Sequence, residues 1–178
     1  MLNRSKIAVG LAAALSVSAV GGVAFAATQG SLGSTSTGTS SLSATVTSLV
    51  QITNVADITL TAATAADPLA GNDSVCVYSN ASGNLYEVTA SSANGSGSFV
   101  LSDGSNTMAY TVNWTDSASS QVALSEGAQT SSNLAGSAST TCADTKTSSV
   151  ALSVPAATWT TSPAGTYTDT LTLVVAPN

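Results

Sequence analysis

The chain of 178 residues contains little charge and no histidine. Charged residues make up 7% of it, against about 25% in an ordinary soluble domain. Three basic residues stand against nine acidic ones, for a formal net charge of −6. The absence of histidine excludes Ser-His-Asp and Cys-His catalysis. The scarcity of lysine and arginine excludes a nucleic-acid partner, because such a partner requires several cationic phosphate contacts.

The first 26 residues have the layout of a secretory signal. Arg4 and Lys6 precede an apolar stretch at residues 7–23, and residues 24–26 (Ala-Phe-Ala) provide small side chains at the cleavage positions. The apolar stretch is interrupted by serines and is shorter than the roughly 20 residues that a membrane-spanning helix needs. We therefore expect cleavage after residue 26, export of residues 27–178, and no membrane attachment after signal cleavage.

Cys76 and Cys142 are the only cysteines of the chain. An even number of cysteines in an exported chain favours a disulfide bond. The pair is separated by 66 residues (142 − 76), for which the loop-entropy model gives a stabilisation of about 4 kcal/mol. Two cysteines without histidine do not form a zinc site.

No other group of residues predicts catalysis or a cofactor. Lys146 lies in a polar segment that does not suggest a serine-activating base. Asp67 and Asp73 lack the spacing of a calcium loop and are typical of turns. Trp114 has the place of a core residue in an alternating strand, whereas Trp159 leaves a sugar-stacking role open. We expect no enzymatic activity, no metal and no cofactor.

Short segments with apolar alternation follow one another through residues 48–178, and none has the 3.6-residue period of a helix. A long polar stretch covers residues 125–147. Such short strands at this spacing predict an all-β sandwich. The expected strands are residues 49–52 with 58–61 (one strand broken near Asn54), 74–79, 85–90, 98–101, 107–114, 122–124, 149–154 and 166–175.

The last of these strands has two distinct faces. One face is hydroxylated and suits an exposed β-surface, with Thr166, Thr168, Thr170 and Thr172. The other face would contact the core, with Tyr167, Asp169, Leu171, Leu173 and Val175. A buried Asp169 would need a hydrogen-bond partner.

The segment between the expected signal and the first core strand changes character along its length. Residues 27–41 are rich in glycine, serine and threonine, as in a flexible leader. From residue 40 the chain alternates with a period of two, which predicts a strand. Its apolar or small face consists of Ser40, Leu42, Ala44 and Val46. The predicted organisation is a signal (1–26), a leader with a strand (27–47) and a β-domain (48–178).

Three segments carry a resemblance to a known family. They are TGTSSLSATVTSLVQI at residues 37–52, DSVCVYSNASGNLYEVTASS at 73–92, and PAGTYTDTLTLVV at 163–175. The last is similar to a Gly-x-Tyr-x-Asp-x-Leu ending. The chain resembles archaic chaperone–usher pilus subunits with a spore coat protein U type domain. Ser40 and Ala44 depart from that family, whose members often place larger apolar residues at such positions.

The resemblance implies an incomplete immunoglobulin-like sandwich with six core strands, the seventh being missing. A periplasmic chaperone would lend a strand to the open groove. At the outer-membrane usher, the tail of the next subunit would replace it and form a head-to-tail polymer on the cell surface. The inserted face would be Ser40, Leu42, Ala44 and Val46, and the acceptor groove Ile52, Leu171, Leu173 and Val175.

Such a fimbrial subunit would support adhesion or biofilm formation. Two alternatives remain open from the sequence, namely a secreted coat or matrix protein and a glycan-binding adhesin module.

Overall fold

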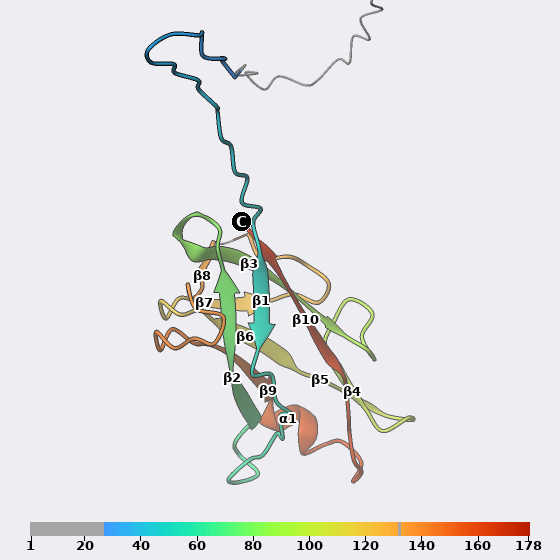
Figure 1. Ribbon diagram of the computed structural model, residues 1–178. Helices are drawn as coiled ribbons and strands as arrows, with labels where there is room; N and C mark the ends of the chain where they lie inside the picture. Colours follow the sequence, from blue (N-terminus) through green and yellow to red (C-terminus); the bar gives the residue numbers. More distant parts are fainter. Residues whose placement is uncertain (1–26, 132) are drawn as a thin grey trace, which may run out of the picture. The chain divides into compact units, whose positions relative to one another are not determined.

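The computed structural model describes residues 27–131 and 133–178 (Figure 1). The expected signal, residues 1–26, lies outside the described residues. The chain divides into two units between Thr45 and Val46, and residues 27–45 are the described part of the first unit. In the described part of the first unit, Thr28 and Thr39 exchange two main-chain hydrogen bonds of 3.0 and 3.1 Å. Residues 40–45 form no ladder.

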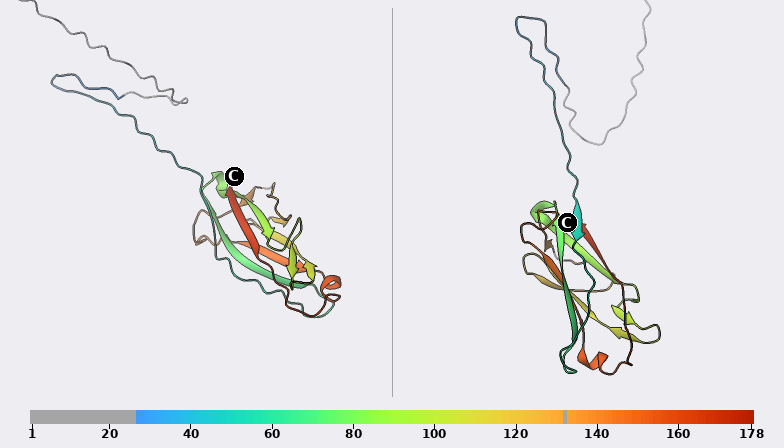
Figure 2. Two further views of the ribbon diagram at one scale, coloured as in Figure 1. Left: turned by 90° about the vertical axis from the view of Figure 1, so that its right-hand side faces the viewer. Right: turned by 60° about the horizontal axis from the view of Figure 1, so that its bottom comes forward.

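The second unit is built almost entirely from antiparallel strands (Figure 1, Figure 2). One sheet has the order β1 (Val50–Thr53), β2 (Leu69–Ser79), β9 (Ser148–Val154), β6 (Thr111–Thr115) and β7 (Gln121–Leu124). The second has the order β10 (Leu171–Pro177), β3 (Leu85–Ser92) and β8 (Leu134–Ala135). β4 (Val100–Ser102) pairs with β5 (Thr107–Ala109), and the helical turns are η1 (Ser82–Asn84) and α1 (Ala156–Trp159). The predicted all-β, immunoglobulin-like fold is confirmed.

The core lies between the two layers and is centred on Trp114, which is fully buried. Trp114 meets Tyr86 edge-on with ring centroids 6.3 Å apart, and its indole N–H donates to the Tyr86 hydroxyl at 2.9 Å. The Tyr86 hydroxyl also bonds the Ser148 hydroxyl at 2.8 Å. Valines from β2, β3, β6 and β9 surround this network. Trp114 is therefore a core residue, as its alternating strand predicts.

Residues 107–114 form two strands where the sequence predicts one. Tyr110 lies between β5, which pairs with β4, and β6, which pairs with β9 and β7. The side chains of Met108, Tyr110, Val112 and Trp114 are all buried, so the alternating pattern is preserved across the change of partner. A hydrophobic pattern identifies which face is buried, but it carries no signal for a strand that passes from one sheet to another.

The C-terminal strand starts later than predicted. β10 begins at Leu171, although Thr168 pairs with Ser102 through two hydrogen bonds of 2.9 Å. The partner changes from β4 to β3 between these points, which interrupts the ladder. The expected hydroxylated face is exposed along its whole length, at Thr166, Thr168, Thr170 and Thr172.

The stretch expected to be polar loop, residues 125–147, contributes to the core. It contains β8, whose Leu134 is fully buried. It also carries Cys142, which forms a disulfide bond with Cys76 on β2. The short helix α1 follows β9 and is not predicted, because its four residues are too few to show a helical period.

Candidate functional site

The two sheets each end in a strand that has a neighbour on one side only among the described residues. β1 ends the five-stranded sheet and β10 ends the three-stranded sheet. The two strands lie in contact, as Figure 1 shows for the cyan and red arrows. An edge strand presents unpaired N–H and C=O groups to any strand that can reach it.

The chain leaves the edge of β2 directly after β1. Thr53 pairs with Cys76, and Thr61 pairs with Ala70. Between these two pairs the chain advances eight residues after β1 (61 − 53) but only six along β2 (76 − 70). The two extra residues form a bulge over residues 54–60 that begins where Asn54 adopts a φ of 61°. The sequence predicts this break near Asn54. It also predicts a continued strand at 58–61, of which only Thr61 pairs.

The bulge is held against β2 by two contacts. The Ala56 N–H donates to the Asp73 carboxylate at 2.7 Å. Ile58 packs over Gly71, where a Cβ atom would lie 2.7 Å from the Ile58 Cγ2 atom. A glycine at position 71 thus allows the bulge to approach the sheet.

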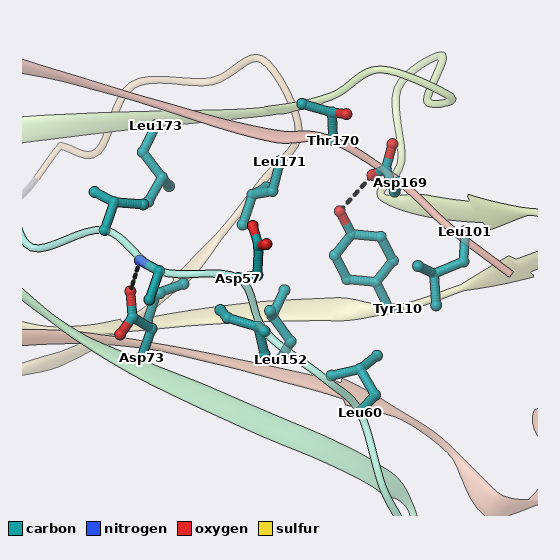
Figure 3. Close-up of a pocket in the computed structure, with 14 residues that line it drawn as sticks. Asp57, Leu60, Asp73, Leu101, Tyr110, Leu152, Asp169, Thr170, Leu171 and Leu173 are labelled. Carbon is teal, nitrogen blue, oxygen red and sulfur yellow. Dashed lines mark hydrogen bonds between the residues drawn. The ribbon is translucent and has the colours of Figure 1, made fainter.

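The bulge and the chain leading into β10 form the two walls of a groove. Its deeper part is a cavity of about 280 Å³ (Figure 3). A second hollow of about 560 Å³ adjoins it and shares five lining residues with it, namely Asp57, Ile58, Leu60, Leu101 and Asp169. The cavity has an apolar lining that includes Ile58, Leu60, Leu101, Val150, Leu152, Leu171 and Leu173. The shared residues make the two hollows one continuous groove.

The β10 edge of this groove offers main-chain groups for pairing. Thr168 bonds with Ser102 through both its N–H and its C=O, and the Asn178 N–H donates to Leu85. In an antiparallel pair, alternate residues direct their N–H and C=O groups to opposite sides. The groups that point toward the groove therefore belong to Asp169, Leu171, Leu173 and Val175. Pro177, which has no N–H, ends this row of donors.

The groove is acidic, since Asp57, Asp73 and Asp169 line it and no basic residue does. Asp169 accepts hydrogen bonds from the Tyr110 hydroxyl at 2.6 Å and from the Asn94 N–H at 3.1 Å. Its partial burial alone would raise the pKa of Asp169, but hydrogen bonding by the side chains of Ser92 and Tyr110 and by main-chain N–H groups outweighs that effect and lowers the pKa below its usual value. The partner that the sequence left unnamed for Asp169 is thus Tyr110. Asp57 is exposed and has no hydrogen-bond partner among the described residues.

The predicted groove residues divide into two pairs. Leu171 and Leu173 line the cavity. Ile52 and Val175 are half-buried against the core but do not line it, because β1 and β10 contact each other at that end. The residues that the sequence did not assign to the groove come from the bulge, β4, the β5–β6 junction and β9: Ile58, Leu60, Leu101, Tyr110, Val150 and Leu152. All six lie in segments that the sequence predicts as strands, but a strand prediction does not identify neighbours in space.

The predicted inserted face is fully available to solvent. Ser40, Leu42, Ala44 and Val46 are all exposed, with 96% exposure for Leu42 and 83% for Val46. Leucine and valine side chains are usually found inside proteins. Two of them on one face of an extended segment therefore form a surface suited to burial in a partner.

The described residues give no second candidate site. Trp159 is half-buried against the core and donates its indole N–H to the Asp67 carbonyl oxygen at 3.0 Å, so it is not a free sugar-stacking platform. Across residues 27–131 and 133–178, no three histidine, cysteine or acidic side chains are grouped to hold a metal ion. None of the helices in this part of the chain has the length and apolarity to cross a bilayer.

The chain matches no known protein-family profile and no curated protein. Its fold is similar to a chain of a solved chaperone–tip adhesin complex, which is described as vital for synergistic activation of CFA/I fimbriae biogenesis. The TM-score is 0.50 at 18% sequence identity, over 72% of this chain and 41% of that one. The chain thus spans less than half the length of its match. The likeness shows a pilus-subunit-like β-fold.

Proposed function

We propose that the protein is a structural pilus subunit that polymerises by donor-strand exchange in a chaperone–usher pathway. The observation that carries the proposal is the open apolar groove between the bulge and the chain leading into β10, together with the exposed Leu42 and Val46 of the tail in the same chain. The tail of one copy would add a strand to the sheet edge of another, which is β-augmentation. Because tail and groove are different surfaces, such contacts build an open, head-to-tail filament.

The free energy of burial favours the tail of a second copy as the occupant of the groove. Full burial of Leu42 and Val46 would contribute roughly 1.5–3 kcal/mol each. Main-chain hydrogen bonds to the free edge of β10 would add to this term. An exposed edge beside an apolar groove is an aggregation hazard in a free subunit. This hazard supports the need for a periplasmic chaperone that covers the groove until the usher brings the next subunit.

The proposal places the protein in the archaic family whose sequence segments it resembles. It would be exported through the periplasm and displayed at the cell surface, where it supports adhesion or biofilm formation. The low charge fits this role, since a subunit held in a fibre does not depend on charge repulsion to stay dispersed.

The test replaces the two large residues of the inserted face with aspartate, as Leu42→Asp with Val46→Asp. We expect surface filaments to disappear in electron micrographs of the cells that produce the protein. The subunit should still accumulate in its chaperone-bound form, because the groove is unchanged. The matched control, Ser43→Asp with Thr47→Asp, adds the same charge to the opposite face and should leave filaments in place. Normal filaments from the Leu42 and Val46 variant would refute the proposal.

A further inference from the structure

The groove contains one carboxylate without a hydrogen-bond donor among the described residues, and the predicted inserted face of the tail contains one side-chain donor, Ser40. Asp57 stands at the junction of the two hollows and belongs to the lining of both. Figure 3 shows its carboxylate directed into the space between the bulge and the chain that leads into β10. The other two carboxylates of the cavity, Asp73 and Asp169, accept hydrogen bonds from the protein itself.

An inserted strand would cover Asp57 and remove water from it. A carboxylate that loses water without gaining a hydrogen bond is destabilised, so the occupant must supply a donor. No side chain of residues 27–47 is charged, and the amino terminus expected at Ala27 lies 13 residues (40 − 27) before Ser40, outside the inserted strand. Of the tail's predicted inward side chains, Leu42, Ala44 and Val46 have no donor at all, and Ser40 has a hydroxyl.

Ser40 is therefore the inward residue of the tail that can bond Asp57 through its side chain. This assignment explains why a small hydroxylated residue occupies a face that otherwise suits apolar burial. We propose that the Ser40 hydroxyl of an incoming tail donates to the Asp57 carboxylate of the accepting copy and sets the position of the tail along the groove. The inference rests on the proposed function and adds the contact that determines the register.

The register follows from the spacing of the strand. Side chains on one face of a strand recur every second residue, so a tail placed two residues out of step would bring Leu42 or Gly38 to Asp57 instead. Leu42 would leave the carboxylate unbonded beneath an apolar side chain, and Gly38 offers no side chain. A single serine thus distinguishes the correct register from its two nearest alternatives.

The experiment measures binding of a fluorescent peptide, residues 37–49, to the full mature chain by anisotropy. The accepting chain carries Leu42→Asp and Val46→Asp so that its own tail does not compete. Ser40→Ala in the peptide should weaken binding by about tenfold, the loss of one hydrogen bond to a charged group. Ser43→Ala, the same change on the opposite face, should leave binding unchanged. Ser40→Lys should strengthen binding at low salt.

The decisive comparison repeats the series on an accepting chain with Asp57→Asn. Asp57 is exposed, so this change should leave the fold intact, which circular dichroism checks. We expect the Ser40→Ala effect to shrink at least threefold and the gain from Ser40→Lys to vanish. Peptide binding with equal Ser40→Ala effects on both chains would overturn the Ser40–Asp57 contact alone. Absence of binding by the unmodified peptide would overturn the donor-strand function, and the contact with it.

Discussion

Replacement of Tyr110 by phenylalanine should destabilise the domain by removing one hydrogen bond. The Tyr110 hydroxyl lies 2.6 Å from the Asp169 carboxylate, and its ring packs against Phe99 with centroids 5.5 Å apart. Tyr110→Phe preserves the ring contact and removes only the hydroxyl. Hydrogen bonds to charged groups contribute about 1.5–3 kcal/mol. Asp169 retains the Asn94 N–H and contact with water, so we expect a loss of about 1–2 kcal/mol.

The unfolding free energy lost in Tyr110→Phe should depend on pH, and it should be larger at neutral pH than in acid. The pKa of Asp169 is lowered in the folded chain. A carboxyl group of this kind stabilises the fold above its unfolded pKa of about 3.9, and the stabilisation is lost as the pH falls through the folded pKa. The difference in unfolding free energy between wild type and Tyr110→Phe should therefore be full at neutral pH. It should shrink below about pH 4.

Urea unfolding followed by circular dichroism at several pH values measures both effects. Tyr78→Phe is the control, because the Tyr78 hydroxyl has no hydrogen bond among the described residues, and this variant should change stability by less than about 0.5 kcal/mol. A Tyr110→Phe variant as stable as wild type would contradict the assigned hydrogen bond. A stability difference between the two proteins that stays constant down to the acid transition would contradict the role of the Asp169 charge.

Three further predictions concern the fold. Leu134→Ala should cost about 2–5 kcal/mol in urea unfolding, because Leu134 is fully buried, and a loss below about 1 kcal/mol would contradict its place in the core. Reduction of the Cys76–Cys142 disulfide, or its replacement by two alanines, should cost about 4 kcal/mol for a separation of 66 residues; an unchanged denaturation midpoint would contradict this. Thr172→Lys, on the exposed face of β10, should change the thermal midpoint little, and a large drop would show that this face is covered.

The strands with clear alternation were predictable because their pattern reflects burial directly. Leu85 to Ser92 alternates between buried and half-buried residues in the structure, and residues 107–114 keep one buried face across two sheets. Leu134 was not predictable in the same way. A single leucine among polar residues shows no period, and its burial depends on β3 and on the disulfide-linked segment around it.

The groove was predictable in part. Alternation on the last strand gave the core-facing side of Leu171 and Leu173, the family resemblance assigned that side to a groove, and both residues line the cavity. The opposite wall was not predictable, because the sequence indicates the break near Asn54 but not the two extra residues that turn 54–60 into a bulge beside β2. Tyr110 and Asp169 meet across 59 residues of sequence. Their contact depends on the packing of both layers, which alternation alone does not specify.

The central claim, that the tail of one copy occupies the groove of another, is tested most directly by photo-crosslinking in assembled filaments. A benzophenone amino acid is placed at position 42 or, as the control, at position 43, in a mixture of isotopically light and heavy subunits. We predict crosslinks from position 42 that join light to heavy chains and map to residues around Leu152, Leu171 and Leu173. Position 43 should give few crosslinks to these residues. Crosslinks confined to one chain, or an equal yield from the two positions, would contradict the account.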